Sequence, residues 1–508
     1  MLPRSALKLT RGKLLCAALA CCLWGLAASQ AAAAEWKFQV AFSREIHPEP
    51  FTGRVCILFS KGDKEPRLGP GWFKPEPFVS LDVEGWKPEE PLVISSETPG
   101  LNAFPEPLAK LAISGMKAQA VIRFNSESRE VGTGAGNGYS QVSALPEQEK
   151  SGEAAAFRVD RLVLPHKLEE TKWSRLLEVR SAALSDFHKR EVSLRGAVVL
   201  PASYYDAPER RYPVMFTIPG FGGTHFDGRR DKPVDEENEQ GIEFVRVFLD
   251  PSCPLGHHVF ADSANNGPVG AALITEFIPE LDRQYRTVSL PTARFLTGHS
   301  SGGWSSLWLQ VTYPDVFGGT WSTAPDPVDF RDFQRINLYA AGENMYRDHR
   351  GARRPIARRG QDPVLWYDDF AAMERTLGPG GQLHSFEAVF SPRGADGRPR
   401  QMWDWKTGEI DSEVADTWMK YDIRLVLERD WVRLGPKLQG KLHIFMGELD
   451  TFYLEGATRL LRDSLAGLGS DAVVEFFPEK DHSNLMTKEL VLRIRREMVQ
   501  SFLKHHGK

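Results

Sequence analysis

The chain has 508 residues, of which 42% are hydrophobic, so it is long enough to bury large cores and to hold more than one domain. Its 63 Lys and Arg residues against 67 Asp and Glu residues give a formal net charge of −4. Nucleic-acid-binding proteins usually carry an excess or a dense cluster of positive charge. This balance therefore argues against nucleic acid as a partner.

The N-terminus has the pattern of a secretory signal peptide over residues 1–34. Basic residues between positions 4 and 13 precede an uncharged stretch at 14–28, and three alanines at 32–34 offer a cleavage site. We expect a secreted or periplasmic protein with no stable membrane span after removal of the signal. The alternative is an uncleaved membrane anchor, because the uncharged run continues to residue 34.

Residues 35–165 differ in composition from the rest, with many Pro and Gly residues and short segments in which polar and apolar residues alternate. Alternation with period two is typical of half-buried strands. Several such strands joined by turns predict an immunoglobulin-like β-sandwich domain. Only Cys56 and Cys253 lie outside the signal, so we expect no disulfide scaffold, although one interdomain bridge could form.

Residues 166–508 are predicted to form a catalytic domain of alternating strands and helices. A buried strand at 212–218 runs into the Gly-rich turn PGFGG at 219–223. A turn of this kind can aim a backbone N–H at a developing oxyanion, and we expect the amide of Phe221 to be that donor. A phosphate cradle is the alternative, but no Gly-Lys-Ser/Thr follows the turn.

The most informative motif is GHSSG at 298–302, which lies between a predicted strand at 293–297 and a predicted helix at 304–313. In a G-x-S-x-G nucleophile elbow, the serine occupies a strained strand-to-helix turn, and the glycines avoid clashes with neighbouring backbone. We therefore predict that Ser300 is the nucleophile and that the amide of Ser301 is the second oxyanion donor. The alternative is a Gly/Ser-rich turn without a catalytic role.

Residues 327–440 separate two predicted strands, and an unstructured loop of that length is uncommon. We predict a cap insertion over the serine. Trp403 and Trp405 would share one face of an extended segment and are the expected substrate contacts, unless the tryptophans form the core of the insertion itself. The Arg-rich run at 347–359 is interpreted as a solvated loop, with a clamp for an anionic substrate as the alternative.

Two further strands precede the expected partners of the serine. The strand at 441–447 leads to Asp450, and the strand at 472–477 leads to His482. A serine nucleophile needs a base and a carboxylate that orients the base, here in the chain order Ser, Asp, His. We predict Asp450 as the acid and His482 as the base. Three other carboxylates are alternatives for the acid: Glu448, Asp326 and Asp329.

These segments resemble the putative esterases of the α/β-hydrolase superfamily, which include enterochelin esterase-like enzymes, feruloyl and acetylxylan esterases, S-formylglutathione hydrolases and mycolyltransferases. The segments that carry the resemblance are 211–223, 277–288, 293–304, 444–450 and 478–482. The resemblance implies an α/β fold with a mostly parallel sheet flanked by helices. One departure is Pro219-Gly220, where many members have His-Gly.

The residues and the resemblance together predict a serine carboxylic-ester hydrolase that forms an acyl-enzyme intermediate. We expect an ester substrate of carbohydrate, phenolic-acid or siderophore type, and no cofactor or metal. The alternatives are a catalytically inactive hydrolase-fold protein that binds or scaffolds, a serine peptidase and an acyltransferase.

Overall fold

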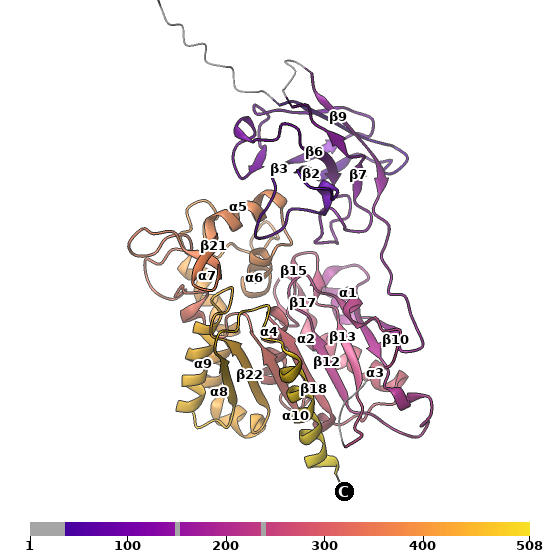
Figure 1. Ribbon diagram of the computed structural model, residues 1–508, viewed down its shortest axis with the longest axis vertical. Helices are drawn as coiled ribbons and strands as arrows, with labels where there is room; N and C mark the ends of the chain where they lie inside the picture. Colours follow the sequence, from indigo (N-terminus) through magenta and orange to yellow (C-terminus); the bar gives the residue numbers. More distant parts are fainter. Residues whose placement is uncertain (1–35, 148–152, 235–239, 508) are drawn as a thin grey trace, which may run out of the picture.

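The computed structural model describes residues 36–147, 153–234 and 240–507, and the predicted signal at 1–34 lies outside these residues. An N-terminal sheet lies at one end of the molecule and a larger α/β body at the other, as Figure 1 shows. In the described ranges, no helix combines the length and the apolar character needed to cross a membrane. Cys56 and Cys253 are both free thiols.

Nine strands form the N-terminal sheet, in the order β4-β1-β9-β7-β6-β2-β3-β5 with β8 paired to β6. Their bounds are β1 (Phe38–Phe42), β2 (Phe51–Ser60), β3 (Phe78–Trp86), β4 (Leu92–Ile94), β5 (Asn102–Phe104), β6 (Lys117–Ile122), β7 (Gly138–Ser140), β8 (Ser143–Ala144) and β9 (Ala155–Leu162). The expected alternation is present, since Phe38, Val40 and Phe42 are fully buried on one face.

The strands of the predicted immunoglobulin-like sandwich are connected in one continuous hydrogen-bonded path. Strand β9 pairs in parallel with β1 along one edge and antiparallel with β7 along the other. These two ladders join all nine strands in one hydrogen-bonded sheet. Alternation along a strand identifies its buried face, but it does not identify the strand's neighbours, which is why the sequence could not exclude this pairing.

The second sheet has eight strands in the order β10-β11-β13-β12-β18-β19-β22-β23. Their bounds are β10 (Ser174–Arg180), β11 (Ser193–Val199), β12 (Val214–Ile218), β13 (Val245–Leu249), β18 (Arg294–His299), β19 (Gly319–Thr323), β22 (Leu442–Gly447) and β23 (Val473–Phe477). Strand β11 is antiparallel to both of its neighbours, and the strands from β13 to β23 are parallel. The mostly parallel sheet that the resemblance implied is therefore present.

Helices cover both faces of this sheet. On β12 and β18, Phe216 and Leu296 pack in a cluster with residues of the helices α3 and α4, whereas the adjacent Met215 and Phe295 pack in a cluster with α10. The helices of this body are α1 (Ala182–His188), α2 (Val269–Ala272), α3 (Ile278–Gln284), α4 (Ser301–Thr312), α8 (Ile423–Leu438), α9 (Glu455–Gly467) and α10 (Lys488–His506). Two short strand pairs accompany them: β14 (Ser252–Cys253) with β15 (Gly256–His257), and β16 (Asp262–Ser263) with β17 (Gly267–Pro268).

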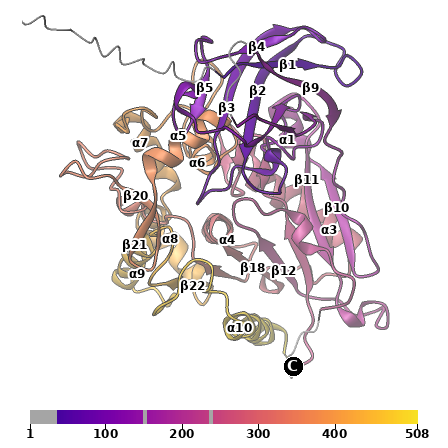
Figure 2. The same cartoon turned by 45° about the horizontal axis from the view of Figure 1, so that its top comes forward.

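The segment between β19 and α8 contains its own secondary structure. Its elements are β20 (Pro355–Arg359), β21 (Asp362–Trp366), α5 (Tyr367–Leu377), α6 (Gln382–Phe390) and α7 (Ser412–Trp418). Helix α5 lies beside β3 and β5 of the N-terminal sheet, as Figure 2 shows, and α6 contacts β15 and β16 of the larger body. One apolar cluster runs from Phe78 and Phe104 of that sheet through Phe370 and Phe386 to Trp304 of α4. The inserted segment thus lies between the N-terminal sheet and the larger body.

Candidate active site

The GHSSG motif forms a sharp turn between β18 and α4. Ser300 adopts φ 60° and ψ −126°, a conformation that a residue with a side chain rarely takes. A Cβ on Gly298 would lie 2.1 Å from the carbonyl oxygen of Gly302, and a Cβ on Gly302 would lie 2.0 Å from that of Ile218. Both distances are far below contact, so the turn requires glycine at these two positions. The turn has the geometry of a nucleophile elbow.

Asp450 and His482 are brought together at the ends of β22 and β23. Nδ1 of His482 donates a hydrogen bond of 2.7 Å to Oδ2 of Asp450, which is fully buried. The backbone N–H of Phe452 donates to the other carboxylate oxygen at 2.8 Å, which fixes the carboxylate plane. Burial is the largest single influence on the pKa of His482 and lowers it, but the charge and hydrogen bond of Asp450, together with the charges of Asp326 and Asp481, raise that pKa overall.

Two of the alternative acids are engaged elsewhere. Glu448 forms an ion pair of 3.3 Å with Arg459. Asp329 is fully buried and binds Arg331 at 2.6 Å and Arg424 at 3.1 Å. The hydrogen bond to His482 Nδ1 is made by Asp450. The geometry therefore favours Asp450 over both.

Asp326, the third alternative, lies next to the nucleophile. The hydroxyl of Ser300 donates to its Oδ1 at 3.4 Å, and the hydroxyl of Ser301 donates to its Oδ2 at 2.6 Å. Burial raises the pKa of Asp326 to about 6. The hydroxyl of Ser300 is thus turned toward Asp326 in this structure, although His482 lines the same cavity. Hydrogen bonds between catalytic groups often tighten only when substrate binds.

The Gly-rich turn after β12 passes directly beside the elbow. A Cβ on Gly220 would lie 3.1 Å from the Cβ of Ser300, a tight contact, so glycine favours this close approach of the turn. Nε2 of His257 lies 3.0 Å from the carbonyl oxygen of Pro219, while its Nδ1 accepts a hydrogen bond from Val259 N–H. Burial lowers the pKa of His257 to about 3, so the ring is neutral and Nε2 must be the donor. His257, which the sequence analysis did not single out, anchors the turn that carries Phe221.

Ser300, Asp326 and His482 line one cavity of about 240 Å³. Most of the other lining side chains are apolar, and they come from regions distant in the sequence. The aromatic members are Trp72, Phe221, Phe370, Phe386 and Phe452. Among the described residues, no group of three or more His, Cys, Asp or Glu side chains is placed to hold a metal ion.

The predicted substrate contacts Trp403 and Trp405 are wrong, because neither ring lines this cavity. The two rings stack on each other at 5.1 Å and are 1% and 5% exposed. Nε1 of Trp403 donates to the hydroxyl of Tyr346, and Nε1 of Trp405 donates to Glu387. Both side chains lie on the same face, as predicted, but that face packs into the core of the insertion.

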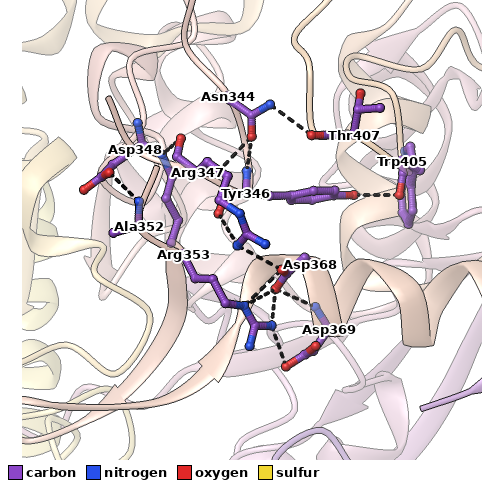
Figure 3. Close-up of polar contacts among 11 residues, drawn as sticks. Asn344, Tyr346, Arg347, Asp348, Ala352, Arg353, Asp368, Asp369, Trp405 and Thr407 are labelled. Atoms are coloured by element: carbon purple, nitrogen blue, oxygen red, sulfur yellow. Dashed lines mark hydrogen bonds and ion pairs between the residues drawn. The ribbon is translucent and has the colours of Figure 1, made fainter. Parts of the chain in front are cut away.

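The Arg-rich run also serves the insertion itself. Arg347 and Arg353 both bind Asp368, and Arg353 also binds Asp369, as Figure 3 shows. Arg354 pairs with Glu343. The guanidinium groups of these arginines are engaged by carboxylates of the protein, so the structure offers no support for an anionic-substrate clamp at Arg347, Arg353 or Arg354.

Arg358, on β20, connects the insertion to the loop that carries the acid. This largely buried side chain donates from Nε to the carbonyl oxygen of Asp450 at 2.9 Å and from Nη2 to Glu455 at 2.7 Å. Its backbone N–H donates to the carbonyl oxygen of Thr451 at 2.8 Å. Arg358 therefore fixes the backbone of the Asp450 loop from outside the catalytic sheet.

The family model described as "Putative esterase" matches residues 189–425. The matched segment contains Phe221 and Ser300 but ends before Asp450 and His482. None of the curated proteins compared with the chain matches it significantly.

Three solved structures illustrate the similarity. A ferulic acid esterase is 11% identical, with a TM-score of 0.40, and the alignment covers 65% of this chain and 99% of that one. An S-formylglutathione hydrolase from Agrobacterium tumefaciens is 15% identical, with a TM-score of 0.39 and coverage of 66% and 95%. Dipeptidyl peptidase 4 of Porphyromonas gingivalis is 12% identical, with a TM-score of 0.37, covering 84% of this chain and 48% of that one. The match of residues 189–425 to the family model confirms the predicted resemblance over that segment and supports the expectation of an ester hydrolase.

Proposed function

We propose that this chain is a secreted serine carboxylesterase in which Ser300, His482 and Asp450 form the catalytic triad. The observation that carries the proposal is the 2.7 Å hydrogen bond between His482 and Asp450, in a cavity shared with a serine on a strained elbow. A buried carboxylate that orients a histidine beside such a serine is the arrangement that nucleophilic acyl transfer needs. Secretion rests on the signal sequence expected at 1–34.

In the proposed reaction, Nε2 of His482 takes the hydroxyl proton of Ser300 while Oγ attacks the ester carbonyl carbon. The electron pair of the carbonyl bond moves to oxygen, which accepts hydrogen bonds from the amides of Phe221 and Ser301. Collapse of this intermediate breaks the bond to the alcohol, which leaves with the proton from His482. Water then attacks the acyl-enzyme by the same sequence and releases the carboxylic acid.

The raised pKa of His482 suits both steps of this proton transfer. Asp450 stabilises the imidazolium that forms when the histidine takes the serine proton. Asp450 also keeps the proton of the neutral ring on Nδ1, which leaves Nε2 free to act as the base. Asp450 thus sets both the tautomer and the basicity of His482.

The cavity lining narrows the substrate classes expected from the sequence. Aromatic and aliphatic side chains cover most of its wall, and they bind a planar or apolar group better than a sugar hydroxyl. An ester with an aromatic acyl group, as in phenolic-acid esters, therefore fits better than a carbohydrate ester without one.

Covalent labelling of Ser300 tests the proposal. A fluorophosphonate probe should label wild-type protein at this residue, and Ser300→Ala should abolish labelling without unfolding the protein. Hydrolysis of an activated ester should fall by roughly a thousandfold or more in this variant. Unlabelled wild-type protein would instead favour the non-catalytic binding or scaffold alternative.

The acid is tested by a matched pair of variants. Asp450→Asn should cut kcat by about four orders of magnitude, because the amide cannot hold His482 in the required tautomer. Glu448→Gln is the control, since Glu448 lies on the same loop and pairs with Arg459. A larger loss in the control than in Asp450→Asn would reassign the acid.

A further inference from the structure

One wall of the cavity at Ser300 comes from the N-terminal region of the chain. Trp72 lies on the loop between β2 and β3 of the N-terminal sheet and lines the cavity together with Ser300 and His482. This indole is partly exposed, so part of its apolar surface is open to a bound group.

The ring of Trp72 contacts aromatic rings from three different segments, one in the insertion and two in the α/β body. It meets Phe370 of α5 edge to face at 5.2 Å, and Phe452 of the acid loop edge to face at 6.1 Å. Its third neighbour is Phe221 of the oxyanion turn, at 5.7 Å and 33°. These contacts fix the plane of the indole relative to the nucleophile.

Hydrogen bonds attach the N-terminal sheet to helix α5 and so keep the wall formed by Trp72 in place. Arg54 of β2 donates to the carbonyl oxygens of Arg375 and Thr376 at 3.0 and 3.2 Å, and Ser80 of β3 donates to that of Thr376 at 2.5 Å. Both acceptors belong to α5, which also carries Phe370. Polar contacts beneath an apolar wall give the pre-organisation that selective binding needs.

A second N-terminal side chain also contacts the oxyanion turn. The guanidinium of Arg129 lies over the ring of Phe221 at 4.8 Å, and its Nη1 donates to the carbonyl oxygen of Gly256 at 3.4 Å. Phe221 therefore keeps one N-terminal contact when Trp72 is changed. A Trp72 variant can therefore remove the indole from the cavity wall while Arg129 still holds the oxyanion turn.

We propose that the N-terminal sheet completes the substrate site, with Trp72 selecting esters whose acyl group is a planar aromatic ring. This inference rests on the proposed function, because it assigns a specificity role within the same cavity. A planar acyl group would stack on or against the indole, whereas an acetyl group has no planar ring to present to it. Trp72 is then a specificity-determining residue supplied by a separate region of the chain.

The experiment compares full-length variants on methyl cinnamate and methyl acetate, which share a leaving group and differ in the acyl part. Trp72→Ala and Trp72→Leu should lower kcat/KM for the cinnamate at least tenfold more than for the acetate. Trp72→Phe should restore most of the difference because it retains a planar face. Leu68→Ala is the control, since Leu68 lies on the same loop, is 51% exposed and does not line the cavity.

Trp72→Leu keeps apolar volume at this site and carries the test if Trp72→Ala does not fold. An equal loss for both esters would overturn the proposal, because it would mean that Trp72 only supports the fold. A wild-type enzyme without preference for the cinnamate would overturn it as well. Failure of the esterase assignment gives a different result, namely no labelling of Ser300 and no hydrolysis of either ester.

Discussion

Replacing Arg358 with methionine should reveal how far the insertion supports the catalytic acid. Met retains most of the apolar length of the side chain but removes the guanidinium. The variant then loses the hydrogen bond to the carbonyl oxygen of Asp450 and the ion pair with Glu455. The first loss should affect catalysis, and the second should affect mainly stability.

The size of each effect follows from burial. The side chains of Arg358 and Glu455 are 9% and 17% exposed, and breaking a buried ion pair by removing one partner costs about 3–5 kcal/mol. Burial already raises the pKa of Glu455, so proton uptake relieves part of the cost, and we expect about 3 kcal/mol. A displacement of the Asp450 loop by about 1 Å would lower kcat by roughly a hundredfold.

Glu455→Gln is the matched control because it removes the ion pair and leaves the hydrogen bond from Arg358 to Asp450. Guanidinium unfolding and kcat on a small ester should be measured for both single variants and for the double variant. Arg358→Met should lose both stability and kcat, Glu455→Gln mainly stability, and the double variant less stability than the two single losses added. Equal kcat values in Arg358→Met and Glu455→Gln would refute a positioning role for Arg358.

Four further outcomes are expected. Gly298→Ala should destabilise the protein by more than about 3 kcal/mol, because its Cβ would meet backbone at 2.1 Å; a folded, active variant would contradict the elbow geometry. Asp326→Asn should shift the acid limb of the pH profile of kcat/KM to lower pH, because the charge of Asp326 helps to raise the pKa of His482; an unchanged profile would count against that coupling. Trp403→Ala should lower the free energy of unfolding by about 3–5 kcal/mol and reduce the activity on acetyl and aryl esters in the same proportion. A loss of activity on only one of these esters would indicate that Trp403 contacts the substrate. The free energy of unfolding should fall as the pH drops below 6.5, because His257 takes up a proton in the unfolded chain but not in the folded state, where its pKa is about 3. This histidine alone should lower the free energy of unfolding by up to about 1.4 kcal/mol per pH unit. Urea unfolding at pH 5 should show a smaller acid-induced loss in His257→Asn than in the wild type.

The catalytic sheet could be predicted from the sequence because buried parallel strands appear as short apolar runs. The runs at 212–218, 293–297, 441–447 and 472–477 correspond closely to β12, β18, β22 and β23. The candidates Ser300 and Asp450 follow such strands directly, so their positions could be predicted without knowledge of the packing.

The remaining parts of the site depend on contacts between distant segments. Trp72, His257 and Arg358 each reach the site from an element whose local sequence carries no catalytic pattern. Trp403 and Trp405 were predicted to contact substrate but lie in a core, because aromatic residues in an insertion suit a pocket and a core equally well. The choice between the two is made by neighbouring groups such as Tyr346 and Glu387, which satisfy the indole N–H groups.

The apolar cluster that runs from the N-terminal sheet to α9 has a consequence for the order in which the chain folds during synthesis. One face of the N-terminal sheet packs in a core of its own, which can form once the chain has been synthesised as far as Val159. Its other face, with Phe78, waits for partners such as Phe370 and ultimately Leu461. The ribosome must therefore add about three hundred residues before that face is covered, a long interval in which exposed apolar surface invites aggregation.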